Sequence, residues 1–365
     1  MSPTVTPDEL IVGVSLNNLL GITQHEYGLA DVISAAQEAE RAGFDAVWLH
    51  DAPLGRRTVA SYDTPMLLGA IATVTDRLRL CTGILQPHLR NPVMFAVQWG
   101  TLTELSGGRT ILGIGTGAGK RSLVDREYQA LAALRHGADL DPEALYAARR
   151  RLFRENAEIL RLLFSQDKVS YEGEFYRFRD VTLGEARPAT PPTMLIATGN
   201  YYPREPGGPV HHGWREDRAG KFVPGPYKYV VDYADGWLTN HVTPGELDEV
   251  WGKLQDYARE RDRERDYLKA LNCFVHIDDD ASRARAGLKE FMNAWHTQVA
   301  DDVVERWGIY GPGEEVARRL REYVDHGVTI FQLVLASPDQ LTQMHRVAEE
   351  VLPRLRTAST AGRAD

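Results

Sequence analysis

The hydrophobic positions of this chain fall into short apolar runs separated by longer amphipathic segments. The runs are rich in Val, Ile and Leu, which is typical of strands buried on both faces of a parallel sheet. They begin at Ile11, Phe44, Leu78, Thr110, Thr193, Gly236, Leu271 and Thr329. The segments between most of them, such as residues 29–43, have apolar positions at spacings of three and four, as helices do. The pattern therefore predicts eight strands that alternate with helices.

Eight repeats of strand and helix indicate the α/β class and, within it, a closed (β/α)8 TIM barrel. A doubly wound open sheet is the alternative, although such a sheet more often has fewer strands and one early glycine-rich turn. We expect a single barrel domain over residues 1–365, with insertions after the fourth and fifth strands. Those strands begin more than 80 residues apart, at Thr110 and Thr193, whereas one strand–helix unit needs only about 30 residues. The expected insertions are a lid or helical segment at about 118–148, a hairpin within 165–190 and a pocket cover at 201–226.

Composition narrows the class of protein. The chain is 43% hydrophobic and 25% charged, as soluble globular proteins are, and no apolar run approaches the roughly 20 residues of a membrane helix. The N-terminal residues do not form a secretory signal, so we expect a cytoplasmic protein. A net charge of -9 argues against nucleic acid as a partner. Cys81 and Cys273 lie in apolar runs, which predicts buried reduced thiols.

A glycine-rich stretch follows the fourth apolar run and contains Gly113, Gly115, Gly117 and Gly119. In a barrel, ligands bind at the C-terminal ends of strands, and glycine there lets backbone N–H groups approach a ligand without a Cβ in the way. The spacing fits neither a dinucleotide-binding fingerprint nor a P-loop. Taken alone, the stretch is equally typical of tight packing and a turn.

The segment LRLCTGILQPHLRNPVMFAVQWGTLTELSGGRTILGIGTGAG, from Leu78 to Gly119, resembles the core of the bacterial-luciferase-like flavin and deazaflavin oxidoreductases. The features in common are the Asn-Pro helix start, the LSGGR helix end and the glycine-rich fourth strand. Similar stretches are AERAGFDAVWLHD, YEGEFYRF, YADGWLTN and GPGEEVARRLREYVDHGVTIFQLVL, so the resemblance covers almost the whole chain. It implies a flavin across the barrel mouth, with its ring against strand three and its phosphate near the ends of strands four and five.

The resemblance also implies which residues contact the cofactor. A non-proline cis peptide behind the flavin ring would fall at Gly83–Ile84. The phosphate would meet backbone and hydroxyl donors at the ends of two strands, because such donors suit an anion. These donors would be Gly115, Thr116, Gly117, Thr198, Gly199, Asn200 and Tyr201.

Candidate catalytic residues follow the second and third strands. The second strand ends in WLHDAP, where many relatives carry a histidine that transfers protons; the resemblance places Asp51 at that position, with His50 beside it. An acid or base there would work within hydrogen-bond reach of the flavin edge or the substrate. The alternative is that Asp51 only caps the following turn. His88 is a further candidate at the mouth.

Substrate contacts are expected from polar and aromatic residues after the strands and in the pocket cover. The candidates are Asn17, Gln86, His211, His212, Trp214 and His241. His211 and His212 have no third ligand at a recognisable spacing, so no metal site is expected. Met66, Met94 and Trp99 lie at helical spacing and are expected in the core rather than against a cofactor.

The main functional hypothesis is an FMN-dependent monooxygenase. Reduced FMN from a separate flavin reductase would react with O2, and the resulting flavin peroxide would oxygenate a small organic substrate. The alternative is an oxidoreductase of the deazaflavin F420 that transfers hydride without oxygen. Lys120, Arg121, Arg204 and Arg215 are candidates to bind the acidic tail of F420. A non-catalytic flavin-binding protein is a third possibility, and the resemblance implies a homodimer through barrel helices.

Overall fold

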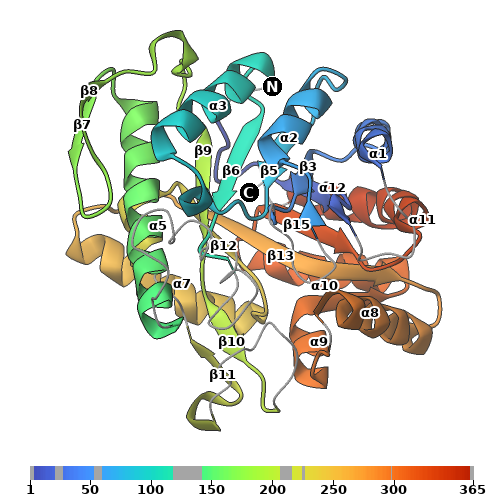
Figure 1. Ribbon diagram of the computed structural model, residues 1–365. Helices are drawn as coiled ribbons and strands as arrows, with labels where there is room; N and C mark the ends of the chain where they lie inside the picture. Colours follow the sequence, from blue (N-terminus) through green and yellow to red (C-terminus); the bar gives the residue numbers. More distant parts are fainter. Residues whose placement is uncertain are drawn as a thin grey trace.

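The computed structural model describes residues 4–20, 28–52, 60–117, 142–205, 216–223, 227–296 and 298–361. Eight parallel strands form a closed barrel surrounded by helices (Figure 1). In order around the barrel, the strands are β12 (Gly236–Thr239), β9 (Thr193–Ala197), β6 (Thr110–Ile114), β5 (Arg79–Thr82), β3 (Ala46–Leu49), β1 (Ile11–Ser15), β15 (Ile330–Leu335) and β13 (Leu268–Ile277). Pairing of β12 with β13 closes the ring. The predicted (β/α)8 barrel and its strands are confirmed, and the open-sheet alternative is wrong.

Alternate residues of the strands fill the interior of the barrel. Trp48, Cys81 and Leu238 belong to one buried cluster inside the ring. Their neighbours Val47 and Leu49 belong instead to the larger cluster between the barrel and its helices. This division follows from the two-residue period of a strand. It also decides which residue just beyond each strand end points toward the barrel axis.

The helices around the barrel begin where the sequence supplies a cap. The Asp63 carboxylate accepts a hydrogen bond from the backbone N–H of Met66 (3.0 Å), and the Asn91 side chain accepts one from the N–H of Val93 (3.0 Å). Gly43, with a φ of 91°, follows the first helix, as predicted for a helix C terminus. The covering helices are α1 (Leu29–Arg41), α2 (Thr64–Ala72), α3 (Pro92–Leu105), α5 (Pro142–Ser165), α6 (Lys228–Tyr233), α7 (Pro244–Glu260), α10 (Gly313–Asp325), α11 (Gln340–Arg346) and α12 (Leu352–Ala361). Among the described residues, no helix is long and apolar enough to cross a membrane.

Three excursions leave the basic barrel. The predicted hairpin is present as β7 (Val169–Glu172) and β8 (Arg177–Val181), which are antiparallel. The predicted cover contains an antiparallel pair, β10 (Asn200–Tyr202) and β11 (Lys221–Val223), while residues 206–215 and 224–226 lie outside the described residues. Of the predicted insertion at about 118–148, residues 118–141 also lie outside the described residues. Residues 142–148 form the start of the long helix α5.

The third excursion was not predicted. It consists of α8 (Ala281–His296), α9 (Asp301–Trp307) and the short strand β14 (Gly308–Gly311), which pairs with the far end of β13. The strand is only four residues long and ends at a glycine, so its apolar run is too short to be recognised as a strand from the sequence.

Predictions about individual buried residues have mixed outcomes. Cys81 and Cys273 are buried free thiols, as expected. Trp99 is fully buried in the core, also as expected. Met66 and Met94, however, are 76% and 59% exposed, so their predicted core positions are wrong. Both lie in the first turn of a helix, on the side that faces away from the barrel.

Candidate active site

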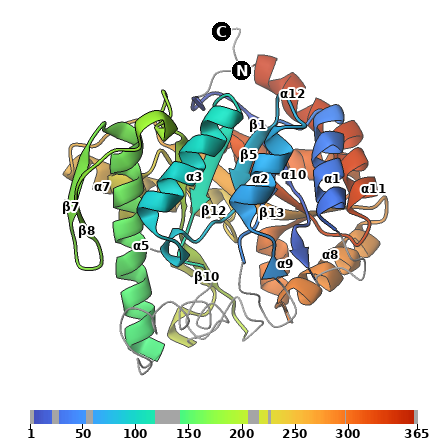
Figure 2. The ribbon, with the colours of Figure 1, turned by 45° about the horizontal axis from the view of Figure 1, so that its top comes forward.

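The C-terminal ends of the parallel strands gather at one end of the barrel, which we call the mouth. Ligands bind at this end in barrels of this type. Figure 2 shows β10 and α9 on this side of the molecule, away from both chain termini. The residues at the mouth are therefore the candidates for ligand binding and catalysis.

At the mouth, the ends of strands β5 and β6 carry glycines, so that their backbones lie close to neighbouring groups. The Gly83–Ile84 peptide bond is cis, as the resemblance implies. A Cβ on Gly83 would lie 2.2 Å from Oε1 of Gln332, and a Cβ on Gly115 would lie 2.6 Å from Cδ1 of Ile84. Gln332 Nε2 donates to the carbonyl of Gly83 at 3.1 Å. A Cβ at either position would therefore displace the end of a neighbouring side chain, the Gln332 amide at Gly83 and the Ile84 methyl at Gly115.

The end of β9 carries an unsatisfied hydroxyl. Oγ1 of Thr198 is buried and has no hydrogen-bond partner in the described part of the chain. The carbonyl of the same residue accepts a hydrogen bond from Nε1 of Trp237 at 2.9 Å, which fixes the backbone. Gly199 follows with a φ of 102°, and Gly117 at the end of β6 has a φ of 75°. Buried hydroxyls are normally paired, so Thr198 is suited to hydrogen-bond a bound group.

Tyr201, expected to contact phosphate, uses its hydroxyl within the protein. The hydroxyl donates to Oδ2 of Asp302 in α9 at 2.8 Å. The Arg306 guanidinium lies 3.8 Å from the centre of the Tyr201 ring and also pairs with Glu246. Burial and then the hydrogen bond to Asp302 raise the pKa of Tyr201. Its contacts join β10 to α9, and its role toward a cofactor stays a prediction, as does that of Thr116 and Asn200.

Asp51 lies in an ion pair rather than open to the mouth. Its buried carboxylate accepts hydrogen bonds from Nη1 and Nη2 of Arg90, both at 2.8 Å, and from the backbone N–H of Gln86 at 3.2 Å. The Gln86 side chain donates to the carbonyl of Asp51 at 3.3 Å. Burial alone would lower the pKa of Arg90, but the Asp51 carboxylate more than offsets this and raises it. These partners come from the loop after β5, so Asp51 joins two strand ends; residues 53–59, which include the turn that it was expected to cap, lie outside the described residues.

His50 is the residue at this strand end that continues the inward register of Ala46 and Trp48. Its backbone is fixed by Asn18, whose Nδ2 donates to the carbonyl of His50 (2.7 Å) and whose Oδ1 accepts from its N–H (3.0 Å). The imidazole meets the indole of Trp295 edge-on, with ring centres 5.0 Å apart. A half-buried histidine on a rigid backbone is well suited to proton transfer.

His88 is fully buried in the short helix η1 (Pro87–Leu89). Neither ring nitrogen has a hydrogen-bond partner among the described residues, and the ring meets Phe153 of α5 edge-on at 6.3 Å. Burial, followed by the nearby charges of Arg149 and Arg90, lowers the pKa of His88 to about 3. The side chain is therefore neutral near pH 7, and its catalytic role stays a prediction.

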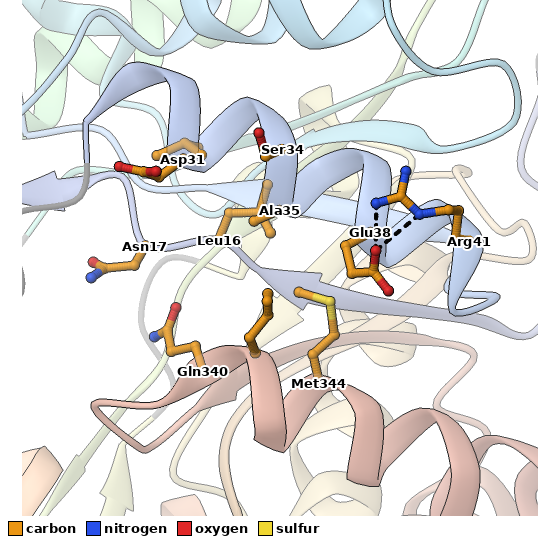
Figure 3. A pocket seen from close by; sticks show the side chains of 11 residues that line it. Leu16, Asn17, Asp31, Ser34, Ala35, Glu38, Arg41, Gln340 and Met344 are labelled. Atoms are coloured by element: carbon orange, nitrogen blue, oxygen red, sulfur yellow. Dashed lines mark hydrogen bonds and ion pairs between the residues drawn. The ribbon is translucent and has the colours of Figure 1, made fainter.

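The remaining predicted substrate residues lie in different places. Asn17 lines a groove of about 300 Å³ between α1 and α11. Figure 3 shows it with Asp31 and Gln340 at one end of this groove, away from the Glu38–Arg41 ion pair. His241 is buried after β12, with a φ of 55°, and contacts Trp307. His211, His212 and Trp214 lie outside the described residues, and no metal-binding group of His, Cys, Asp or Glu occurs within the described ranges.

Sequence reasoning missed an aromatic cluster at the mouth. It comprises Phe274, Phe291, Trp295, His296 and Trp307, which we call the aromatic wall. Spacing of four between the aromatic residues of FMNAW was an available signal. It does not reveal that these rings approach the ends of other strands.

A barrel whose mouth combines bare strand-end backbone, an unsatisfied hydroxyl and a fixed histidine has the features of a cofactor-dependent enzyme. The family model described as luciferase-like monooxygenase matches residues 11–329. The chain belongs to this family, as its sequence resemblance indicated, and it is an oxidoreductase.

Curated relatives are similar over nearly the full length. The chain is 26% identical over 356 residues to the F420-dependent glucose-6-phosphate dehydrogenase of Intrasporangium calvum, covering 91% of this chain and 96% of the relative. It is 24% identical to the 5,10-methylenetetrahydromethanopterin reductase of Archaeoglobus fulgidus, covering 87% and 93%. Among solved structures, an F420-dependent secondary alcohol dehydrogenase aligns with a TM-score of 0.70 and 19% identity, over 95% of this chain and 99% of that chain. This last likeness shows the fold.

The relatives correct the main functional hypothesis. The expected FMN-dependent monooxygenase, which consumes O2 and reduced flavin, is contradicted because the similar curated proteins are F420-dependent dehydrogenases. The F420 alternative accounts for these relatives better. The error has a simple cause: the motifs that carry the resemblance position a cofactor in either branch and do not distinguish its chemistry.

Proposed function

We propose that this protein is an F420-dependent oxidoreductase that transfers hydride between the deazaflavin and a small organic molecule. The observation that carries the proposal is its similarity, over almost the full length of both chains, to F420-dependent dehydrogenases. When bound, F420 supplies a ring that accepts a hydride or returns one. A hydride transfer of this kind requires neither O2 nor a separate flavin reductase.

The residues at the mouth fit this cofactor. The strand-end backbone around the cis Gly83–Ile84 bond would support its ring, and the buried hydroxyl of Thr198, which has no partner among the described residues, would bind its phosphate, next to Gly199 and Gly117. Four basic residues are candidates to bind the acidic tail of F420, and Arg204 is the one that lies within the described residues. Its backbone N–H donates to Asp302 at 2.8 Å, which fixes this segment against α9.

His50 is the residue we propose for proton transfer. Oxidation of an alcohol to a carbonyl releases a hydride from the carbon and a proton from the hydroxyl, so a base must accept that proton. His50 points along the inward register of β3, and its backbone is fixed by Asn18. Asp51 is less suited to this role because Arg90 binds both oxygens of its carboxylate.

The cofactor assignment is tested by equilibrium titration of the purified protein with F420 and, separately, with FMN. We expect tight binding of F420 and weak binding of FMN. Thr198→Val should weaken F420 binding by about ten- to a hundredfold, the value of one hydrogen bond to a charged group, while Thr198→Ser should bind nearly normally. Tight binding of FMN with none of F420 would overturn the proposal.

A further inference from the structure

The excursion formed by α8, α9 and β14 stands over the mouth rather than outside the barrel. The last residue of β12, Thr239, pairs with Leu271 of β13, whereas β14 pairs with residues Phe274 to Ile277 farther along the same strand. The excursion thus begins where the barrel wall formed by β12 ends. Figure 1 shows α9 between α8 and the β10–β11 pair.

Two contacts connect the aromatic wall to opposite sides of the mouth. Trp295 meets His50 beyond β3 with ring centres 5.0 Å apart, and Trp307 meets His241 beyond β12 at 3.8 Å. Strands β3 and β12 lie across the barrel from each other in the strand order. Phe274 joins the two indoles, with ring centres at 5.7 Å from Trp295 and 4.7 Å from Trp307. The wall therefore spans the mouth.

Trp295 is more exposed than its neighbours in the aromatic wall. Trp307 is 6% exposed and Phe274 is 1% exposed, so both are packed inside the protein. Trp295 and His50 are only half-buried, and their rings are in contact. A molecule that reaches the imidazole of His50 would also meet the indole of Trp295.

Two guanidinium groups at the mouth, those of Arg306 and Arg90, already pair with carboxylates within the described residues. Arg306 pairs with Glu246 and covers the Tyr201 ring. Arg90 pairs with Asp51 through both oxygens. Neither guanidinium is placed to bind a substrate phosphate, whereas an indole face attracts apolar and ring-shaped groups.

We propose that Trp295 determines substrate specificity and that the substrate is an uncharged, ring-bearing alcohol or the corresponding ketone, not a phosphorylated sugar. The ring of the substrate stacks on Trp295, which brings its hydroxyl to His50. In the oxidising direction the hydroxyl proton passes to His50 and the carbon gives up a hydride to F420, so this inference rests on the proposed function. It separates the chain from the glucose-6-phosphate dehydrogenases to which it is similar.

The test uses cyclohexanol, benzyl alcohol and glucose 6-phosphate as probes. Binding of each probe to the protein is measured by saturation-transfer NMR with and without F420, and F420 reduction is then followed by absorbance. We expect both ring alcohols to bind and to reduce F420, and glucose 6-phosphate to do neither. In Trp295→Leu, the KM for the ring alcohols should rise about tenfold with little change in kcat, and F420 affinity should be unchanged.

Trp251→Leu is the matched control, because Trp251 lies on the outer helix α7, where it stacks on Trp237, and is remote from His50 in sequence. It should leave probe binding unchanged. If F420 binds and glucose 6-phosphate reduces it while the ring alcohols do not bind, the specificity inference is overturned and the proposed function stands. If F420 itself does not bind, the proposed function fails. Equal loss of ring-alcohol binding in both tryptophan variants would also contradict the role of Trp295.

Discussion

At the scale of single residues, the most informative pair is His50 and Asp51. They are adjacent, but strand alternation turns one toward the barrel axis and the other toward the loop after β5. Comparison of motifs selects Asp51, because it aligns residues by their position along the chain and takes no account of side-chain direction. The backbone geometry instead favours His50 for chemistry and gives Asp51 a buried ion pair with Arg90.

Replacing His50 should impair catalysis without affecting cofactor binding. His50→Gln removes the proton acceptor but keeps a side chain of similar length, so kcat should fall by about 10²- to 10⁴-fold. The affinity for F420 should stay within about twofold of the wild type. Single-turnover kinetics and cofactor titration measure the two effects. A variant with normal turnover would exclude His50 as the proton-transfer residue.

Replacing Asp51 should act mainly on stability. Asp51→Asn removes the carboxylate that binds both Nη atoms of the largely buried Arg90 guanidinium and leaves it Oδ2 of Asp63 at 3.4 Å, which should lower the free energy of unfolding by up to about 3–5 kcal/mol. Urea denaturation measures this change. The exposed Glu38–Arg41 pair is the control, because Glu38→Gln should cost no more than about 1 kcal/mol. Unchanged stability with lost turnover would instead support the catalytic role that the family resemblance assigns to Asp51.

His88 should make stability depend on pH. Its pKa is lowered to about 3 in the folded protein, so between about pH 3 and 6.5 the unfolded chain binds the proton more readily. The contribution of His88 is fully present above pH 6.5 and is lost progressively as the pH falls toward 3, by on the order of 4 kcal/mol. His88→Leu should flatten this slope in urea denaturation. An equal slope in the His88 variant would contradict the prediction.

At the scale of elements, the junction of β5 and β6 shows why the glycine-rich stretch is built as it is. A Cβ on Gly113 would lie 2.1 Å from the backbone oxygen of Thr82, whose hydroxyl donates to the carbonyl of Gly113 at 2.8 Å. Neither strand can move away without breaking the pairing between them. The tight-packing interpretation therefore applies to Gly113, while the positive φ of Gly117 ends the stretch in a turn.

Gly113→Ala should therefore destabilise the barrel. Inserting a methyl group against a fixed carbonyl should lower the free energy of unfolding by about 1–3 kcal/mol. Gly69→Ala is the matched control, because a Cβ there meets nothing within 4 Å and the residue lies inside α2. The control should gain about 0.5–1 kcal/mol from the improved helix propensity. Thermal denaturation compares the two, and similar behaviour of both variants would show that the close approach of β5 and β6 can relax.

At the scale of the whole molecule, the outward face of α2 and α3 exposes apolar side chains near both ends of the two helices, with polar residues such as Gln98 and Glu104 exposed between them. Met66 and Met94 are exposed in the first turns of the two helices, and Val74 and Leu105 are 40% and 55% exposed at their other ends. We propose that this face joins two copies of the chain, in keeping with the homodimer that the family resemblance implies. Large apolar side chains exposed close to one another often mark protein contacts.

Charges placed on that face should separate the copies. The double variant Met66→Glu and Met94→Glu should sediment as a monomer in analytical ultracentrifugation, whereas the wild type should sediment as a dimer. Leu341→Glu, on the separate helix α11, should leave the dimer intact. A monomeric wild-type protein would overturn the proposal.

Most of the barrel could be predicted because the sequence patterns that specify its strands and helices each lie within one short segment of the chain. Each strand is a short apolar run, the helices between them have a regular period, and parallel strands joined by helices close into a ring when there are eight of them. Asn91 and Gly43 fix a helix start and end by rules that involve only neighbouring residues. The cis bond at Gly83–Ile84 followed from a motif that is also continuous in sequence.

The sequence by itself thus determined the class of fold, the family and the end of the barrel where chemistry occurs. Only the tertiary structure decided that Asp51 binds Arg90, that Tyr201 joins β10 to α9, and that Trp295 meets His50. Trp295 and His50 are 295 − 50 = 245 positions apart in the sequence. No local sequence pattern encodes a contact over such a separation. The physical reason is that the direction of a side chain at a strand end depends on the register of its neighbours, and its partner depends on where a distant excursion packs.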